Sequence, residues 1–191
     1  MKYLPALLFI LLFGCGEQKN TLPHIVIATT MGDVEAELYP DKAPKTVAAF
    51  LSYIDKGYFK NAAFYRVIMQ EGLTPAQNRG IIQGGVWETQ SQLANLPGIE
   101  HETTQQTKLS HTSGTLSLAR TKPGTASTEF FICIGDQTQY DYGNEGVSDM
   151  QGYAAFGKVT SGMDVVKQIQ QQPANGESFI KRIEIKNIER D

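Results

Sequence analysis

Two segments of the chain place residues where they could bind a ligand. Arg66 lies in the apolar run 64–68, and the two-residue period of a strand puts it on the same face as Phe64. In residues 130–134 the same alternation leaves Phe131 facing away from the core. An arginine stays charged and offers several donors in a fixed fork, so an arginine beside a surface phenylalanine predicts a ligand-binding surface.

The other chemical patterns in the sequence are weak. His24, His101 and His111 lack the spacing of a metal site, so a surface or structural role is expected for each and no metal ligand is predicted. The sequence contains no nucleophile elbow and no phosphate-binding glycine loop. Cys133 lies inside an apolar strand and is expected to be a buried small hydrophobe rather than a reactive thiol. Trp87 is expected to pack rather than to form a ligand platform.

Length, composition and charge describe an ordinary globular chain. Its 191 residues favour a single domain, and 41% of them are hydrophobic. It carries 17 basic and 20 acidic residues, for a formal net charge of −3. The basic residues form no dense run, whereas binding to a phosphate backbone needs a concentrated positive surface. The sequence therefore predicts no nucleic-acid partner.

The first 14 residues differ from the rest of the chain. Lys2 is followed by an uncharged apolar run, residues 3–13, which is too short to span a bilayer and is typical of a signal peptide. The run ends at Gly14 and Cys15, a pair that resembles a bacterial lipobox. That resemblance implies cleavage after Gly14 and lipidation of Cys15. The alternative is an ordinary cleaved signal peptide followed by an incidental cysteine.

Lipidation of Cys15 would anchor the protein to a membrane, since each buried methylene contributes ~0.8 kcal/mol. Gly16 stands where lipoproteins kept in the inner membrane typically have aspartate. The resemblance thus implies a cell-envelope protein, on the outer membrane and facing the periplasm if the host has two membranes. Residues 15–23 are then the lipidated cysteine and a polar tether, and residues 24–191 form the domain. Cys133 is the only other cysteine, so no intrachain disulfide is predicted.

Beyond the tether, short strands alternate with two separated helices. Residues 25–39 read as a hairpin whose second strand alternates apolar and polar residues. Pro44 is expected to begin a helix that runs to about Lys56 and carries one apolar stripe. A second helix is expected near Ser161, with Asp164 forming a capping-box-like pair. Many short strands with two helices indicate a closed or nearly closed antiparallel barrel capped by helices.

Five segments of the chain, taken in order, resemble the cyclophilins, the barrel-shaped peptidyl-prolyl cis-trans isomerases. The resemblance runs from about Val26 to Ile188, and the segments are Phe64-Tyr65-Arg66-Val67-Ile68, Ile82-Gln83-Gly84-Gly85, residues 114–120, Phe130-Phe131-Ile132 and Phe156-Gly157-Lys158-Val159. It implies a mainly β fold, a closed eight-stranded antiparallel barrel capped by two α-helices. It also implies a monomer that catalyses rotation about Xaa-Pro bonds in exported proteins, assisting their folding, with neither cofactor nor metal.

Prolyl isomerisation requires a particular set of groups. The bond resists rotation with a barrier of about 18–20 kcal/mol, so a catalyst needs an apolar slot for the ring, a grip on the backbone and a donor toward the nitrogen. The resemblance makes Arg66 the catalytic arginine, with Gln83 binding substrate and steadying it. Phe131 matches the floor of the proline pocket. The full substrate-binding set implied is Phe64, Ala119, Arg120, Glu129, Phe131, Tyr140 and Tyr153.

The chain departs from the family's pattern in the connection after the arginine strand. Residues 69–80 replace a short turn that usually carries a second pocket phenylalanine, and Gly80 and Ile81 stand near that position. Either the pocket lacks this wall, or Leu73 or another residue of the insert supplies it.

Two acidic residues also depart from the pattern. Glu129 replaces a glutamine and could pair with Arg66, where it would either compete with substrate or orient the arginine. Asp141 stands where an apolar pocket residue is common. These differences leave a second function open: a proline-peptide-binding, chaperone or scaffold module on the same fold, with weak or no catalysis.

Overall fold

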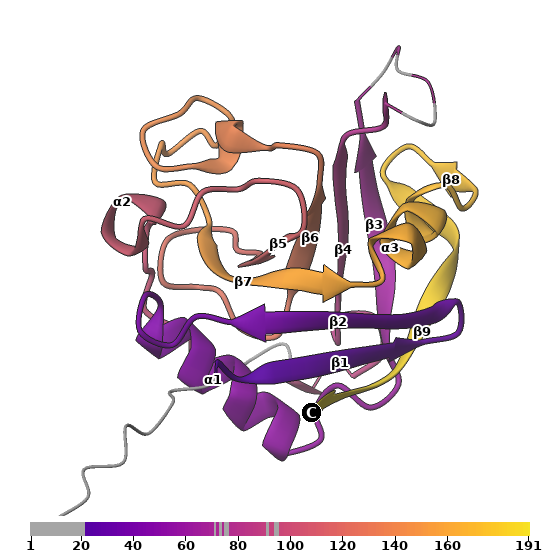
Figure 1. Cartoon of the computed structure of the whole chain (residues 1–191), viewed down its shortest axis with the longest axis horizontal. Helices are drawn as coiled ribbons and strands as arrows, with labels where there is room; N and C mark the ends of the chain where they lie inside the picture. Colours follow the sequence, from indigo (N-terminus) through magenta and orange to yellow (C-terminus); the bar gives the residue numbers. More distant parts are fainter. Residues whose placement is uncertain (1–21, 71, 73, 75–76, 91, 94–95) are drawn as a thin grey trace, which may run out of the picture.

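The computed structural model describes residues 22–70, 72, 74, 77–90, 92–93 and 96–191. Within them, eight antiparallel strands close into a barrel with helices packed around it (Figure 1). The barrel strands are β1 (His24–Thr29), β2 (Gly32–Leu38), β3 (Ala62–Met69), β4 (Gly80–Gly85), β5 (Thr115–Leu118), β6 (Phe130–Ile134), β7 (Ala154–Ser161) and β9 (Ser178–Arg190). The remaining elements are α1 (Pro44–Asp55), α2 (Thr104–Thr107), the 3-10 helix η3 (Thr138–Tyr140), α3 (Met163–Gln170) and the short strand β8 (Ala174–Asn175).

The strand order closes the barrel. It runs β1-β2-β7-β5-β6-β4-β3-β9, and pairing between β1 and β9 joins the two ends. The two-residue strand β8 pairs with β9 alone and adds a small hairpin to the outside. A closed ring leaves no barrel strand with an unpaired edge, which removes the usual route to edge-to-edge aggregation. The predicted eight-stranded barrel is confirmed.

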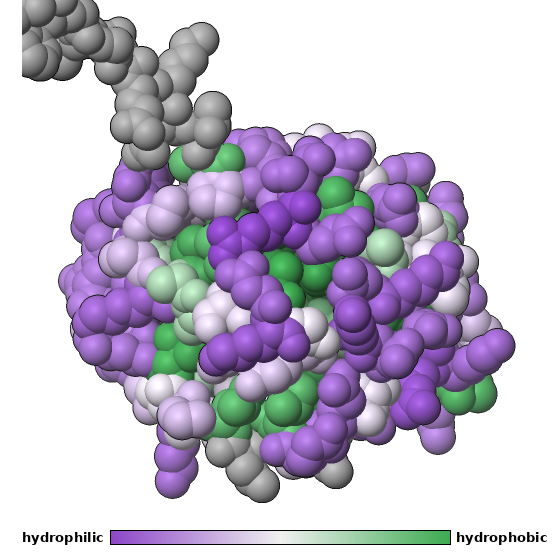
Figure 2. Space-filling model, turned by 90° about the horizontal axis from the view of Figure 1, so that it is seen from below, coloured by the Kyte–Doolittle hydropathy of each residue, from purple (hydrophilic) through white to green (hydrophobic). Residues whose placement is uncertain are grey.

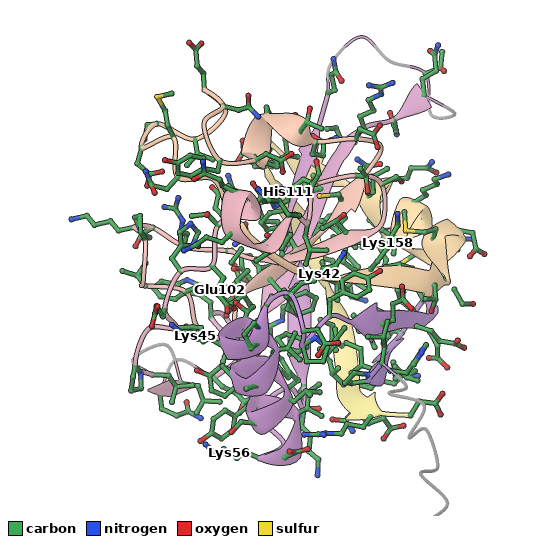
Figure 3. The ribbon with its side chains drawn as sticks, turned by 60° about the vertical axis from the view of Figure 1, so that its left-hand side comes forward. Lys42, Lys45, Lys56, Glu102, His111 and Lys158 are labelled. Carbon is green, nitrogen blue, oxygen red and sulfur yellow. The ribbon has the colours of Figure 1, made fainter. Side chains whose placement is uncertain are left out.

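Helix α1 buries the face that its apolar stripe predicted. The residues of that stripe are buried against the barrel: Val47, Phe50, Leu51 and Ile54. At its N-terminus the buried carboxylate of Glu102 accepts hydrogen bonds from the backbone N–H groups of Lys45 (3.2 Å) and Thr46 (2.8 Å). Figure 3 shows Glu102 close to Lys45 at this end of the helix. A negative charge at this end is favourable, because the helix dipole is positive there.

Helix α3 begins later than predicted. Ser161 is the last residue of β7, and the helix starts at Met163 after Gly162, whose φ of +85° turns the chain out of the strand. Within the described part of the chain no side chain caps the helix, so the expected pair of Ser161 with Asp164 is wrong. Val166 and Ile169 of this helix are both fully buried.

The barrel interior is filled by aliphatic side chains and a group of five phenylalanines. Their ring centroids lie 4.9–6.0 Å apart in tilted or edge-to-face contacts, a favourable geometry for aromatic pairs. The five are Phe50, Phe59, Phe64, Phe130 and Phe156. This cluster ties α1 to strands from both halves of the chain.

The surface of the molecule is largely polar on the one face that Figure 2 shows. On the face shown in Figure 2, hydrophilic side chains predominate and apolar residues form small patches between them. No helix within the described residues combines the length and apolar composition that crossing a membrane demands. A second apolar cluster, separate from the interior, contains Ile81, Phe131 and Cys133, and the residues predicted to do chemistry surround it.

Candidate active site

The predicted functional residues lie in one cross-strand row. Arg66 of β3 is the ladder partner of Gln83 of β4, and Gln83 is the partner of Phe131 of β6. Phe131 in turn pairs with Ser117 of β5. Directly paired residues point to the same face of a sheet, so the row sets the guanidinium, the amide and the aromatic ring side by side on the outer face of the barrel.

Phe64 does not belong to this row. A β-bulge interrupts β3, because Phe64 pairs with Gly84 while Arg66 pairs with Gln83, so that two steps on β3 match one step on β4. Tyr65 is the extra residue, and it reverses the alternation on either side of itself. Phe64 is therefore fully buried in the barrel core and does not line the site. The expectation that Phe64 shares a face with Arg66 is wrong.

A chain of hydrogen bonds holds Arg66 from its buried side. Arg66 Nη1 donates to Gln83 Oε1 (2.9 Å), and Gln83 Nε2 donates to the Tyr65 hydroxyl (2.9 Å). The Tyr65 hydroxyl donates to Glu129 Oε2 (2.6 Å). Among the described residues Glu129 has no hydrogen bond or ion pair with Arg66, so the expected direct pairing is wrong. Glu129 acts on the arginine only through Tyr65 and Gln83.

Glu129 is held in place by neutral donors. Its Oε1 accepts from the backbone N–H groups of Val86 (2.8 Å) and Trp87 (3.0 Å) and from the Thr128 hydroxyl (3.1 Å). Burial raises the pKa of Glu129, while these donors and Tyr65 oppose the rise. Burial and the nearby Glu129 charge raise the pKa of Tyr65 above its ordinary value, so the phenol keeps its proton and remains a donor.

Phe131 forms the floor of the site. It is buried together with Ile81 and Cys133, and its ring meets those of Tyr140 and Tyr153 edge to face, with centroids 5.9 and 5.2 Å away. Burial raises the pKa of the Cys133 thiol, which agrees with the expected role of a small buried hydrophobe. The floor is thus a rigid aromatic and aliphatic surface.

His111 supports this floor from beneath. Its ring is fully buried and stacks on Phe131 with centroids 5.8 Å apart, and Figure 3 shows it inside the fold. Its Nδ1 lies 2.6 Å from Asp141 Oδ1, and its Nε2 lies 2.9 Å from the Ser117 hydroxyl. Partial burial alone would raise the pKa of Asp141, but hydrogen bonds from His111 and Ser110 lower it. Asp141 therefore fixes the support of the floor and, among the described residues, is not part of the lining.

Arg120 builds a side wall. Its Nη1 and Nη2 donate to the two carboxylate oxygens of Asp149 (2.7 and 2.9 Å), and its Nε donates to the Gly152 carbonyl (3.0 Å). The guanidinium also lies over the ring of Tyr153, 5.3 Å from its centroid. The Arg120 side chain is only 1% exposed, so most of its hydrogen-bonding capacity serves the protein itself.

These side chains enclose a groove of about 490 Å³. The lining contains every predicted catalytic or substrate-binding residue except Phe64: Arg66, Gln83, Ala119, Arg120, Glu129, Phe131, Tyr140 and Tyr153. An apolar floor with a cationic donor at its edge can hold a small apolar ring and donate a hydrogen bond to a polar group beside it. This geometry needs no nucleophile.

Residues 24–190 match the family described as cyclophilin type peptidyl-prolyl cis-trans isomerase/CLD. The chain belongs to the cyclophilin family. It is 35% identical over 167 residues to the peptidyl-prolyl cis-trans isomerase of Acinetobacter baylyi, covering 86% of this chain and 80% of that protein. It is 36% identical over 153 residues to peptidyl-prolyl cis-trans isomerase B of Escherichia coli, covering 76% of this chain and 82% of that protein.

Solved structures agree with this assignment. A cyclophilin type peptidyl-prolyl cis-trans isomerase of Cryptosporidium parvum matches with a TM-score of 0.69 and 25% identity, covering 90% of this chain and 98% of that one. A second structure of that protein, in the presence of the dipeptide Ala-Pro, matches with a TM-score of 0.66. The present cyclophilin is a peptidyl-prolyl cis-trans isomerase, as the resemblance implied.

Several residues lining the groove of this cyclophilin were not predicted from the sequence. Ile68 and Ile81, which flank the insert, line the groove, and Leu73 lies outside the described residues. Tyr65 joins the lining because of the bulge. Trp87 also lines the groove and is 61% exposed, so the expectation that it packs is wrong. In the sequence, its position just after Gly84 and Gly85 was the one signal available.

Proposed function

We propose that Arg66 is the catalytic residue of this cyclophilin, that Gln83 positions it, and that Phe131 receives the proline ring of an Xaa-Pro substrate. The cross-strand row of these three residues is the observation that carries the proposal. It sets a cation and an apolar floor next to each other, on three adjacent strands rather than on loops.

Arg66 has hydrogen-bonding capacity to spare. It bonds to Gln83 through Nη1 and to Glu177 Oε2 through Nε (2.9 Å) and Nη2 (2.5 Å). A guanidinium has five N–H donors, so one on Nη1 and one on Nη2 remain for a substrate. The side chain is 39% exposed, which leaves it accessible from the groove.

Rotation about a prolyl bond localises the lone pair on the nitrogen, which delocalisation spreads into the carbonyl in the planar ground state. A donor placed toward that nitrogen stabilises the twisted state more than the planar one and so accelerates rotation. Phe131, with Tyr140 at its edge, would hold the proline ring while the preceding carbonyl swings. No bond to the protein forms at any step.

The test is cis–trans exchange of a short Xaa-Pro peptide measured by NMR, using the full chain in a mild detergent. Arg66→Ala should lower kcat/KM by about 100-fold, the typical cost of losing one transition-state donor. Arg182→Ala is the matched control, because Arg182 is an exposed arginine of β9 outside the groove lining. Unchanged exchange in Arg66→Ala would refute the assignment. Peptide binding without exchange in the parent would favour a binding or scaffold module instead.

We also propose that the enzyme works as a monomer on exported proteins, anchored in the cell envelope by lipid on Cys15. The support is the apolar run 3–13 followed by Gly14 and Cys15, which lie outside the described residues. Uncatalysed prolyl isomerisation takes tens to hundreds of seconds, slow enough to limit the folding of a newly exported chain.

Intact mass and membrane fractionation test the anchor. The mature protein should begin at Cys15, carry acyl chains and sediment with membranes, whereas Cys15→Ser should be released from them. If the parent protein were soluble and its mass showed no acyl chains, residues 1–14 would be an ordinary cleaved signal peptide and Cys15 an incidental cysteine. Light scattering of the detergent-free Cys15→Ser protein should give the mass of one chain, 21.1 kDa or less after cleavage.

A further inference from the structure

The exposed side of Arg66 is occupied by Glu177, a residue that no predicted role includes. Glu177 Oε2 accepts from both Nε and Nη2 of the guanidinium, and the two side chains are 39% and 57% exposed. An ion pair this exposed contributes little to stability, since solvent and salt screen it. The effect to consider is therefore the charge that Glu177 places beside the groove.

The backbone brings Glu177 to Arg66 without help from its own side chain. The residue lies in the turn between β8 and β9, and its carbonyl accepts a hydrogen bond from the Val67 N–H (2.8 Å). The following residue, Ser178, is the ladder partner of Arg66. A substitution of the Glu177 side chain therefore leaves the turn docked on β3.

Glu177 contributes a negative charge beside Arg66 and is not needed to orient its guanidinium. Arg66 is already held from its buried side by Gln83, which Tyr65 and Glu129 hold in turn. Among the described residues, Oε1 of Glu177 has no hydrogen-bond partner, so one lone-pair-bearing oxygen stays open beside the groove. The remaining effect of Glu177 is a negative charge next to the functional arginine.

The charged residues that line the groove and their ion-pair partners carry a net negative charge. Among the described lining residues, the charged ones are Arg66, Arg120 and Glu129. Glu177 pairs with the first arginine and Asp149 with the second. Among the residues that the structure describes, Glu129 accepts only from neutral donors and forms no ion pair. Two positive and three negative groups leave a net charge of −1.

We propose that Glu177 sets the charge preference of the groove, so that the enzyme favours Xaa-Pro segments carrying a basic side chain beside the proline over segments carrying an acidic one. This rests on the proposed function of the groove. An extended chain advances about 3.3–3.6 Å per residue. A side chain next to the proline therefore lies within the Debye length of about 8 Å at physiological salt.

The experiment compares three peptides that differ only in the residue before proline: lysine, glutamine or glutamate. Exchange rates and binding shifts are measured by NMR with the full chain in detergent. The parent should favour the lysine peptide over the glutamate peptide by about five-fold in kcat/KM, the upper range for one exposed charge pair. Glu177→Gln should reduce this preference to about two-fold or less, and about 0.5 M salt should do the same to the parent.

Glu184→Gln is the matched control, because it removes one exposed carboxylate from β9, the strand that follows Glu177, outside the groove lining. It should leave the preference of the parent intact. Equal rates for the three peptides in the parent would overturn the inference and leave the isomerase proposal standing. An equal loss of rate for all three in Glu177→Gln would also overturn it, since that pattern marks a positioning residue. If no peptide exchanges faster, the isomerase proposal fails, and the binding shifts decide the charge preference alone.

Discussion

Two arginines line the same groove, and they differ in how many donors the protein keeps for itself. Arg120 is 1% exposed and makes four hydrogen bonds to Asp149 and Gly152. Arg66 is 39% exposed and makes three, to Gln83 and Glu177. The first is a structural tie between the end of β5 and the segment before β7. The second keeps two donors for a ligand.

This difference shows that residue type and membership of a groove do not define a role. Arg120 follows β5 directly, and there the backbone carbonyl of Gly152 and the carboxylate of Asp149 surround the guanidinium. Arg66 stands within a strand, on the outer face of the sheet, where its ladder neighbour is a neutral amide. What each arginine can offer a substrate follows from what surrounds it.

The largest expected effect is a contrast between two variants, of which one loses catalytic activity and the other loses stability. Arg66→Ala should lower kcat/KM by about 100-fold and leave the unfolding free energy unchanged. Arg120→Ala should lower the unfolding free energy by about 1–2 kcal/mol, because the packing of the buried guanidinium and its hydrogen bonds to the Gly152 carbonyl and to the partly exposed Asp149 are lost. Urea denaturation and NMR exchange on both variants measure the two quantities. If both substitutions reduced the same property by similar amounts, the contrast between the arginines would not hold.

The next effect concerns how Arg66 is oriented. Gln83→Ala removes the acceptor of Arg66 Nη1 and the donor to Tyr65, so the guanidinium is left to its exposed partner, Glu177. We expect kcat to fall by about ten-fold with little change in KM, since misorientation of a catalytic group costs rate more than binding. Progress curves at several peptide concentrations separate the two constants. A change confined to KM would assign Gln83 to substrate binding alone.

A smaller effect is expected on stability at acidic pH, where the ion pair between Arg120 and Asp149 is lost. Hydrogen bonds from Arg120 lower the pKa of Asp149 from 3.8 to about 2. Because the folded-state pKa is depressed, this contribution to stability is complete above the ordinary pKa and is lost as the pH falls from about 4 to about 2. Asp149→Asn should flatten that part of the stability profile, measured by urea denaturation across this pH range. A profile as steep as that of the parent would place the acid sensitivity elsewhere.

The smallest effect should come from Glu129→Gln. The glutamine carbonyl can still accept from the Val86 and Trp87 N–H groups, and its amide can donate to the Tyr65 hydroxyl. Exchange rates for a neutral peptide should therefore stay within about two-fold of the parent. A gain of ten-fold or more would show that this carboxylate restrains Arg66 after all.

Much of the fold followed from local pattern. The period-two alternation of β2 correctly predicts that Val34, Ala36 and Leu38 are buried, and the stripe of α1 predicts which face packs on the barrel. Motif order located Arg66, Gln83 and Phe131, and the structure brings these three together. Each of these features depends on neighbours within a few residues or on a segment that is itself a recognisable unit.

The errors and omissions share one cause. Alternation placed Phe64 on the face of Arg66, but the bulge at Tyr65 is created by pairing with β4 and β9, and no local signal marked it. Glu129 was expected at Arg66, yet its bonds go to Tyr65 and to the N–H groups that follow β4. Register and partner choice are properties of strand pairs, and a single strand does not contain them.

The sequence by itself determined the family, the barrel with its helices and the identities of the three central site residues, because these follow from periodicity and motif order. Only the tertiary structure decided which arginine keeps free hydrogen-bond donors and which carboxylate forms an ion pair with each arginine. Glu177 reaches Arg66 across 111 positions of the chain, and Asp149 reaches Arg120 across 29. Electrostatic balance depends on distance in space, which emerges only when the barrel closes.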